Sequence, residues 1–496
     1  MRSIFLISMA IGFAICAGLY MVSAPIAIFL ALILLALLFV GIMDMMQTKH
    51  AIKSNFPVIG HFRYILEAIR PEIQQYFIES NIDGAPINRN KRSLVYQRSK
   101  RELESLPFGT QEDVYKQGNE WVCHSMYPGK VADDFDRILV GGKDCKKPYL
   151  SSRLNISAMS YGSLSDRAVM ALNKGAKEGG FSHNTGEGGI SEFHKQGGDL
   201  VWQIGTGYFG CRTPEGDFSP EVFAEKAQWE NVKMIEIKLS QGAKPGKGGI
   251  LPGVKVTEEI AEIRGVPVGE TVISPPSHKE FDGPQGLLEF VKKLRDLSGG
   301  KPVGFKLCVG RKSEFLEIIS AMKSTNILPD FITVDGSEGG TGAAPPEFSN
   351  AVGMPLKDGL SFVSNSLKEA GLRNEIRILA AGKSLTGFDM IRNFSLGADI
   401  VNSARGMMLS LGCIQALRCH SNHCPVGITT SNPSLVKGLD VDYKSQRVAS
   451  YQIETLKVVK SLLSAMGKTG PGDVELSDVH QRQSGGGYLT YDKIYD

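Results

Sequence analysis

The feature that most constrains the fold is a repeated alternation of short apolar runs with helical stretches, which begins near residue 150. The apolar runs read as strands that end in glycine or polar loops: 155–159, 200–204, 234–239, 303–309, 331–334, 376–381 and 399–403. Helical stretches lie between several of them, at 166–177, 285–297 and 313–322. Alternation of strand and helix predicts a parallel sheet.

Seven or eight such units over roughly 270 residues fit a (β/α)8 barrel, whose typical length is about 250 residues. The alternative is a doubly wound sheet. That fold usually opens with a Gly-x-Gly-x-x-Gly turn and carries an acidic residue about 20 positions later. The sequence contains no convincing example of this turn, so we predict the TIM barrel.

The first fifty residues carry a second constraint, because no charged residue occurs between Ser3 and Met43. A membrane span needs about 20 apolar residues, so this run is long enough for two. Pro25 lies near its middle and suits a tight turn between helices. We therefore predict a transmembrane hairpin over residues 1–46. A single long anchor is one alternative, and a secretory signal, which has a shorter apolar core, is the other.

Basic residues flank both ends of this run, at Arg2 on one side and at Lys49, Lys53, Arg63 and Arg70 on the other. Positive flanks face the cytoplasm, so the sequence predicts a protein of the inner membrane with its catalytic body in the cytoplasm. We expect residues 47–149 to form an extension that packs on the barrel. Residues 150–435 would form the barrel, and residues 436–496 a helical tail.

Composition excludes some classes of function. A hydrophobic content of 42% and a charged content of 22% are those of a globular protein with a substantial core. The net charge is only +3, and no basic stripe is interleaved with aromatic residues, so nucleic acid is not an expected partner. The 56 glycines predict many tight turns where the backbone can approach a ligand closely.

Polar side chains fall where barrel strands end, which is where barrel enzymes build their active sites. Ser160 follows the first run, and Gln203 and Lys238 end later runs. Lys306 lies inside the run 303–309, beside Gly304. A lysine in an apolar strand is often an edge or snorkelling residue, but inside a barrel we expect it to point at an anionic ligand.

Two glycine-rich loops and an arginine follow three successive runs. The first loop, 337–342, contains Gly339, Gly340 and Thr341, and the second contains Gly382 and Lys383. Arg405 follows the last run. Barrels commonly bind phosphate through loops after strands seven and eight. Any one loop can be an ordinary turn, but the three together predict a phosphate-bearing cofactor, with Lys383 and Arg405 supplying positive charge.

Three of the eight cysteines crowd into twelve residues: Cys413, Cys419 and Cys424. The other five are scattered, which makes a poor disulfide framework, whereas the triplet suits a metal site in a reducing compartment. Zinc sites usually need closer cysteine pairs and four ligands, which His420 or His423 could complete. Three thiolates can instead hold a three-iron cluster, or a four-iron cluster with an outside ligand, and Pro425 is typical of ferredoxin-type loops.

The segment CIQALRCHSNHCPVG at residues 413–427 resembles the cluster loop in the synthase domain of glutamate synthase. The resemblance extends across residues 150–435 in the family's order. It includes SAMSYGSLS (157–165), SHNTGEGG (182–189), QIGTGYFG (203–210), IKLSQGAKPGKGG (237–249), ISPPSHKEF (273–281) and DGSEGGTGAAP (335–345). Residues 56–77, FPVIGHFRYILEAIRPEIQQYF, resemble a subgroup described as FMN-binding glutamate synthase family proteins.

The resemblance implies FMN and a [3Fe–4S] cluster as cofactors. It also implies glutamate biosynthesis: ammonia and 2-oxoglutarate form an imine, which FMN reduces to L-glutamate by hydride transfer while the cluster relays electrons. The electron donor would be ferredoxin or a membrane reductase. Carried over position by position, the residues that contact FMN would be Ser160, Gln203, Lys306, Gly340, Thr341 and Gly382. Those that face the keto acid would be Glu187, Lys238 and Lys244.

The sequence departs from the family pattern in four places. The chain begins Met1-Arg2, without the amidotransferase cysteine that releases ammonia, and the family's C-terminal β-helix has no counterpart. KPGEGGQLPG reads KPGKGGILPG, with Lys247 for the acid and Ile250 for a glutamine that in the family lies at the substrate and flavin face. GFGT becomes residues 402–405, so Arg405 would replace backbone amides at the phosphate.

Three functions follow from these observations. The first is a glutamate synthase-like oxidoreductase. The second is a related FMN and iron–sulfur enzyme acting on a different keto acid or amine, for example to form an N-alkyl amino acid, which the Ile250 change favours. The third is a membrane electron-transfer module without substrate chemistry. Glu187, Lys238 and Lys244 argue against the third, because a relay needs no anion pocket.

Overall fold

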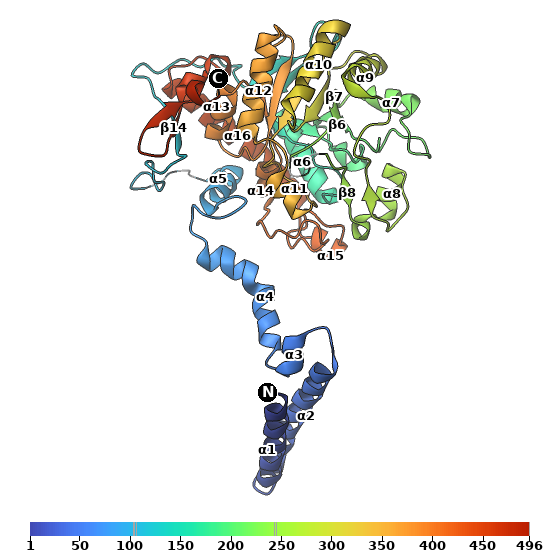
Figure 1. The fold of residues 1–496 in the computed structure, drawn as a ribbon, viewed down its shortest axis with the longest axis vertical. Helices are drawn as coiled ribbons and strands as arrows, with labels where there is room; N and C mark the ends of the chain where they lie inside the picture. The colour runs from blue at the N-terminus through green and yellow to red at the C-terminus, as the bar shows by residue number, and fades with distance from the viewer. Residues whose placement is uncertain (103–104, 106, 243, 245, 496) are drawn as a thin grey trace. The chain divides into compact units, whose positions relative to one another are not determined.

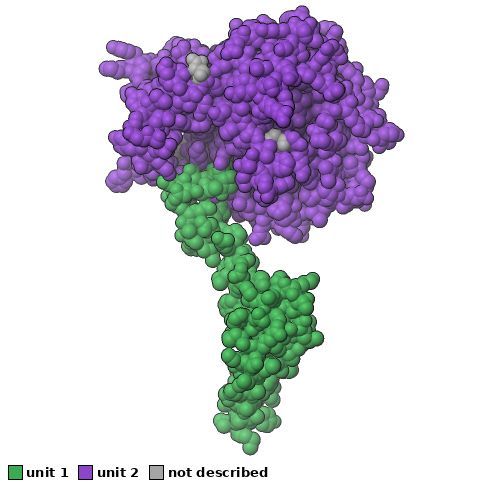
Figure 2. All heavy atoms as spheres, in the orientation of Figure 1, with its two compact units in different colours: residues 1–89 green, residues 90–496 purple. Residues whose placement is uncertain are grey.

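The computed structural model describes residues 1–102, 105, 107–242, 244 and 246–495. The chain divides into two compact units, Met1–Arg89 and Asn90–Asp496 (Figure 2).

The first unit begins with two apolar helices packed side by side, α1 (Arg2–Tyr20) and α2 (Ala24–Met46) (Figure 1). Ser23 is extended and Pro25 lies in the first turn of α2, so the chain reverses within a few residues. Both helices are long and apolar enough to cross a membrane, with mean hydropathies of 2.1 and 3.2. By length and composition, they are candidate membrane spans.

Polar contacts lie at the end of this helical pair where α1 begins and α2 ends. Asp44 is buried near the end of α2 and accepts hydrogen bonds from His61 Nε2 at 2.8 Å and from the Val58 amide at 2.9 Å. Arg2 Nε donates to the Ser54 carbonyl at 2.7 Å. These contacts hold the short helix α3 (Ala51–Asn55) and the start of helix α4 (His61–Ile73) against the helical pair. Helix α4 continues as the π-helical turn η1 (Gln74–Ile78).

The second unit is built on a closed barrel of eight parallel strands. In barrel order they are β4 (Leu154–Ile156), β5 (Ser182–Asn184), β6 (Asp199–Ile204), β7 (Val232–Lys238), β10 (Val303–Leu307), β11 (Phe331–Asp335), β12 (Arg377–Ala381) and β13 (Ile400–Ser403). Pairing of β13 with β4 closes the ring. The predicted TIM barrel is confirmed, and the doubly wound alternative is excluded because the sheet has no open edge.

Helices surround the barrel (Figure 1). The main ones are α6 (Asp166–Gly179), α7 (Pro220–Ala227), α9 (Gly283–Leu297), α10 (Lys312–Thr325), α12 (Leu356–Glu369), α13 (Gly387–Ser395) and α14 (Arg405–Leu411). Helix α6 shows how the local sequence determines where a helix begins and ends. Ser165 accepts a hydrogen bond from the Ala168 amide at the start of α6, and Gly180 ends it in a left-handed conformation.

A hairpin of β2 (Arg137–Val140) and β3 (Tyr149–Ser152) covers the N-terminal end of the barrel. Its Val140 packs on the apolar side chains that fill this end, which are Val201, Met234, Phe331, Leu379 and Ile400. Apolar residues thus fill the N-terminal end of the barrel, and the polar side chains lie toward its C-terminal end.

The chain after residue 435 is only partly helical, which corrects the predicted helical tail. Helix α16 (Val441–Ala465) packs against α6, α13 and α14. The 3-10 turns η4 (Pro471–Asp473) and η5 (Leu476–Asp478) follow, and then β14 (Val479–Arg482), β15 (Tyr488–Thr490) and α17 (Asp492–Tyr495). Strand β14 pairs with β1 (Glu120–Val122), so this sheet joins the two ends of the second unit. The finer boundaries at residues 46, 149 and 435 stay predictions.

Candidate active site

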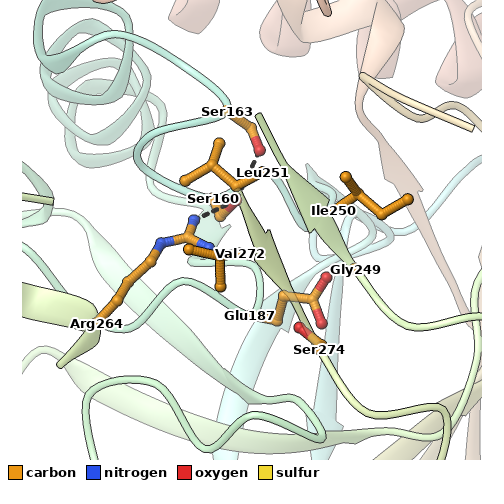
Figure 3. A pocket seen from close by; sticks show the side chains of 9 residues that line it. All are labelled: Ser160, Ser163, Glu187, Gly249, Ile250, Leu251, Arg264, Val272 and Ser274. Atoms are coloured by element: carbon orange, nitrogen blue, oxygen red, sulfur yellow. Dashed lines mark hydrogen bonds between the residues drawn. The ribbon is translucent and has the colours of Figure 1, made fainter. Parts of the chain in front are cut away.

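A pocket lies at the C-terminal ends of the barrel strands (Figure 3). It is lined by Ser160, Ser163, Glu187, Gly249, Ile250, Leu251, Arg264, Val272 and Ser274. The two serines come from the loop after β4, and Glu187 comes from the loop after β5. The long connection after β7 supplies the rest, through the ribbon of β8 (Ile250–Leu251) and β9 (Val272–Ile273) and the helix α8 (Glu258–Arg264).

Glu187 lies among three cations. Its Oε1 accepts a hydrogen bond from Lys238 Nζ at 2.7 Å. Burial acts to raise the pKa of Glu187, but Lys238, Lys244 and Arg264 outweigh it and hold that pKa below its ordinary value. Glu187 is therefore a carboxylate, and positive charges exceed negative ones around it. Such a site favours an anionic ligand.

Lys244 differs from Lys238 in how it is held. Its Nζ donates to the Ala343 carbonyl at 3.1 Å, and its side chain is buried. Burial and the neighbouring Lys238 lower the pKa of Lys244 to about 8. The Lys244 ammonium can therefore give up and regain a proton near neutral pH.

The barrel interior below the pocket is polar and fully buried. Glu236 accepts hydrogen bonds from Asn184, Gln203 and Thr333 at 2.8, 2.7 and 2.6 Å. Lys306 lies beside Lys238 in the strand register, and its Nζ is 3.1 Å from Asp335 Oδ2. The structure thus places Lys306 inside the barrel, not at an edge.

Carboxylates control the charge of Lys306. Burial acts to lower the pKa of Lys306, but Asp335, Glu236 and Glu187 raise it above its ordinary value. The lysine is therefore a permanent cation at the centre of the barrel.

The glycine loop after β11 folds back so that Gly339 lies close to Asp335, the last residue of that strand. A Cβ at Gly339 would lie 2.8 Å from Asp335 Oδ1, so only glycine fits there. Thr341 follows, and its Oγ1 donates at 3.4 Å to the Ala343 carbonyl, the same oxygen that Lys244 contacts. This loop therefore borders both the barrel interior and the pocket.

Two cations meet beyond that loop. Arg405 donates to the Glu338 carbonyl and lies next to Gly340, while Lys383 follows Gly382, whose φ of +147° disfavours other residues. Burial lowers the pKa of Lys383, and Arg405 lowers it further. Glu338 attracts both cations, but neither forms a direct ion pair with a carboxylate among the described residues. Two adjacent unpaired cations among glycines are suited to hold a phosphate.

The cysteine triplet begins two residues after α14, the helix that Arg405 opens. Burial raises the pKa of Cys413 to about 11, and Cys419 and Cys424 add to the shift, so the three thiols lie within reach of one another's charge. Among the described residues, no three Cys, His, Asp or Glu side chains gather closely enough for a single metal ion. The zinc alternative with His420 or His423 therefore gains no support.

Comparison with known proteins identifies the family. Residues 109–469 match the sequence model described as the conserved region in glutamate synthase. The match spans well over half of the chain. The chain belongs to the glutamate synthase family.

Two relatives show how far the likeness extends. The chain is 40% identical to the glutamate synthase large subunit-like protein YerD of Bacillus subtilis (strain 168), over 91% of this chain and 94% of the relative. It is 34% identical to an archaeal glutamate synthase (NADPH) of Methanocaldococcus jannaschii, over 68% of this chain and 66% of the relative. Relatives of the archaeal type are thus matched over at most about two thirds of their length.

Solved structures share less with this chain. Mandelate oxidase bound to benzoyl-formic acid aligns with a TM-score of 0.44 and 14% identity, over 81% of this chain and 90% of that one. This level of likeness carries no argument about the site of this glutamate synthase family member.

Arg264 lines the pocket but was not predicted from the sequence. It is 4% exposed, its Nη2 donates to the Tyr161 carbonyl at 2.9 Å, and its guanidinium lies 5.2 Å from the centre of the Phe209 ring. Its Nε has no hydrogen-bond partner among the described residues. Burial lowers the pKa of Arg264 to about 10, and Glu187 opposes that shift. An arginine in the last turn of a helix is a common capping residue, so no sequence signal distinguished it.

Proposed function

We propose that this protein is a glutamate synthase-like oxidoreductase that reduces the imine of a keto acid in the pocket of Figure 3. The observation that carries the proposal is the excess of positive charge around Glu187. Arg264, Lys238 and Lys244 together offer three cations to one carboxylate. A keto acid with two carboxylates would supply the missing negative charge.

The residues present fit FMN. Lys383 and Arg405 would hold its phosphate, with the backbone near Gly340 and Gly382 approaching closely. Lys306, kept protonated by Asp335 and Glu236, would offer a fixed positive charge to the anionic edge of the flavin ring. FMN bound here supplies the hydride that reduces the imine.

The remaining roles belong to Glu187 and Arg264 of the pocket and to the two lysines whose charges act on Glu187. Arg264 and Lys238 would bind the carboxylates of the keto acid. Lys244 Nζ, whose pKa is lowered to about 8, would donate the proton that the carbonyl oxygen needs to leave as water. Glu187 would orient Lys238 through their 2.7 Å hydrogen bond and balance its charge.

Cys413, Cys419 and Cys424 would hold a [3Fe–4S] cluster that supplies single electrons. Cluster thiolates bind different irons and so lie further apart than the ligands of one ion. Burial acts to raise the pKa of Cys424, but Thr429 and the amides of residues 426 and 428 lower it below its ordinary value, which favours the thiolate. Only the short helix α14 separates these cysteines from Arg405 at the proposed phosphate site.

The two apolar helices support membrane attachment. We propose that α1 and α2 form a transmembrane hairpin in the inner membrane, with both termini in the cytoplasm. The electron donor would be ferredoxin or a membrane reductase, and ammonia would come from outside the chain.

Ile250 supports a second candidate, in which the substrate is a different keto acid or an amine replaces ammonia. Ile250 is among the residues that line the pocket, and Leu251 and Val272, which pair across the β8–β9 ribbon, give the pocket an apolar wall. An apolar wall suits an alkyl group, as on an N-alkyl amino acid. A module without substrate chemistry is disfavoured, because a pocket with surplus cations has no use in a relay.

One experiment separates these functions. The purified full-length protein is reduced without oxygen, and 2-oxoglutarate is added with ammonium or with methylamine. Flavin reoxidation is followed by absorbance and products by mass spectrometry. Glutamate formed with ammonium supports the first function, and product formed only with methylamine supports the second. Reoxidation no faster than in buffer for both mixtures would contradict the synthase proposal.

A further inference from the structure

Lys255 is a buried lysine between the pocket and the cysteine loop. It ends the 3-10 turn η3 (Gly253–Lys255), four residues after Leu251 of the pocket, and it is 3% exposed. Its Nζ donates to the Thr429 carbonyl at 2.7 Å and to the Ser163 carbonyl at 3.3 Å. Ser163 lines the pocket, and Thr429 lies five residues after Cys424. One ammonium group thus joins three loops.

Further hydrogen bonds reinforce this junction. Asn422 Nδ2, inside the cysteine loop, donates to the Val254 carbonyl at 3.0 Å. Ser165 Oγ donates to the Gly427 carbonyl at 2.7 Å, and the Ser165 amide donates to the Ile428 carbonyl at 2.8 Å. The cysteine loop is therefore held against two of the loops that line the pocket, the one after β4 and the one after β7.

The charge of Lys255 has no carboxylate to balance it in the described part of the chain. The hydrogen-bond partners of its Nζ are neutral carbonyls, and the groups that would attract its charge are Cys419 and Cys424 in their thiolate form. An unpaired buried charge costs several kcal/mol, so buried cations are normally retained beside a negative partner. A cluster held by these cysteines would be that partner.

We propose that Lys255 is a positioning residue that raises the reduction potential of the iron–sulfur cluster and holds the cysteine loop against the pocket. This inference rests on the cluster of the proposed function. One-electron reduction adds one negative charge at the cysteines, and the buried ammonium stabilises that charge because screening is weak away from water. The charge of Lys255 therefore favours the reduced state of the cluster.

Three substitutions separate charge from tethering. Lys255→Gln keeps a donor for the two carbonyls but loses the charge, Lys255→Met loses both, and Lys255→Arg keeps the charge. Lys301→Met is the matched control. Lys301 is also buried and donates only to carbonyls, those of Ala227 and Trp229, but it lies at the start of β10, at the opposite end of the barrel.

The potential is measured by mediated redox titration of the detergent-solubilised full-length protein, read by absorbance and electron paramagnetic resonance. Lys255→Gln and Lys255→Met should each lower the electron affinity of the cluster at least tenfold, which is 59 mV for a one-electron couple. Lys255→Arg and Lys301→Met should stay near the wild-type potential.

The iron content of the purified protein distinguishes a failure of the cluster assignment from a failure of the role proposed for Lys255. Wild-type protein purified without oxygen and found to contain no iron would overturn both the cluster and the role of Lys255. A wild-type cluster whose potential is unchanged by Lys255→Gln would overturn this inference alone. If Lys255→Met loses iron through misfolding, the glutamine variant decides the question.

Discussion

Arg264 lines the pocket, and its buried Nε has no hydrogen-bond partner among the described residues, which makes it the first residue to test. We expect Arg264→Met to lower kcat/KM for the keto acid roughly a hundredfold, about 3 kcal/mol, because a buried carboxylate would lose its charged partner. Steady-state kinetics with varied keto acid would measure this loss, mostly as a rise in KM.

Arg212→Met is the matched control for this substitution. Its guanidinium also lies near the Phe209 ring, at 5.5 Å, and its Nε also lacks a partner among the described residues, yet it does not line the pocket. Equal losses in the two variants would show that Arg264 acts through packing on Phe209 and not through the substrate.

Ile250 tests the choice of substrate. Ile250→Gln restores the amide found in the family, and one hydrogen bond to a carboxylate contributes about 1.5 kcal/mol. We expect roughly a tenfold rise in kcat/KM for 2-oxoglutarate with ammonium. Ile273→Gln is the control, because Ile273 lies opposite Ile250 in the β8–β9 ribbon but is 67% exposed. An unchanged kcat/KM in Ile250→Gln would remove the reason to doubt 2-oxoglutarate.

For individual residues of the site, the sequence predicts the position of those that lie in or directly after a predicted strand. Lys238 ends a strand and Lys306 lies inside one, as the strand pattern predicts. Glu187 lies inside the segment SHNTGEGG, so its assignment came from the resemblance and not from the strand pattern. Arg264 and Lys255 escape such reasoning. Each lies in a helical turn of the β7–β10 connection, and its burial depends on loops distant in the sequence.

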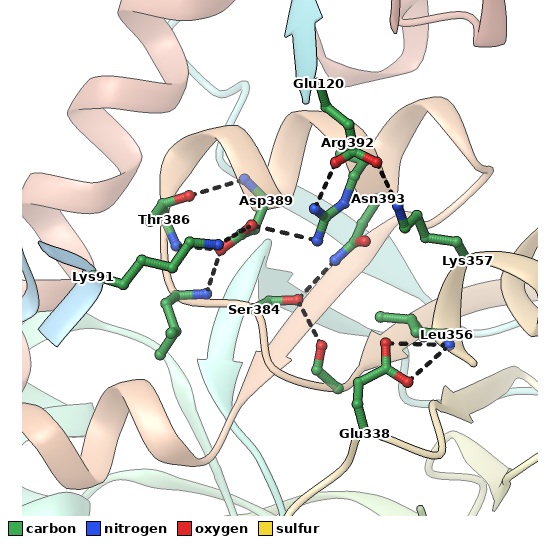
Figure 4. Close-up of polar contacts among 12 residues, drawn as sticks. Lys91, Glu120, Glu338, Leu356, Lys357, Ser384, Thr386, Asp389, Arg392 and Asn393 are labelled. Carbon is green, nitrogen blue, oxygen red and sulfur yellow. Dashed lines mark hydrogen bonds and ion pairs between the residues drawn. The ribbon is translucent and has the colours of Figure 1, made fainter. Parts of the chain in front are cut away.

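Among the secondary-structure elements, β1 is connected to its neighbours through the carboxylate of Glu120, which Figure 4 shows beside Arg392 and Lys357. Glu120 accepts hydrogen bonds from Arg392 of α13 at 3.0 Å, from Tyr491 at 2.6 Å and from Gln481 of β14 at 3.0 Å, and it also pairs with Lys357 of α12. Removing one partner of a buried ion pair usually costs about 3–5 kcal/mol. We expect Glu120→Ala to lower the free energy of unfolding by this amount in urea titrations.

The exposed pair of Glu192 and Lys195, 2.7 Å apart, provides the control, and Glu192→Ala should leave the urea midpoint unchanged. Acid should mimic the loss at Glu120. Burial acts to raise the pKa of Glu120, but Arg392 and Lys357 hold it below the ordinary 4.5. The folded state thus binds its proton at lower pH than the unfolded state, and this contribution is lost as pH falls below about 4.5. Equal acid sensitivity of wild type and Glu120→Gln would contradict this.

Helices were predictable where the apolar period and caps agree. The stretch 166–177 became Asp166–Gly179, 285–297 became Gly283–Leu297, and 313–322 became Lys312–Thr325. Strand β5 was missed because Ser-His-Asn contains no apolar residue, and barrel closure alone buries it. Strand β14, Val-His-Gln-Arg, contains one apolar residue and no clear alternation, so the prediction of a helical tail did not include it.

For the whole molecule, membrane attachment should depend on α1 and α2. Only 6% and 11% of their most apolar windows are buried, so water would face a large apolar surface without a bilayer. We expect full-length protein to stay in the membrane fraction after carbonate washing, and a variant lacking residues 2–46 to be soluble and still yellow with flavin. Full-length protein released by carbonate would contradict the hairpin.

The pairing of β1 with β14 has a consequence for how the protein is made. Glu120 and Gln481 are neighbours across 361 positions of sequence. A ribosome adding about 5–20 residues per second needs roughly 20–70 s to cover that distance. During this time β1 is an unsatisfied edge, and a chain cut short before residue 479 never covers it. The sheet of β1, β14 and β15 therefore forms only when the chain is nearly complete.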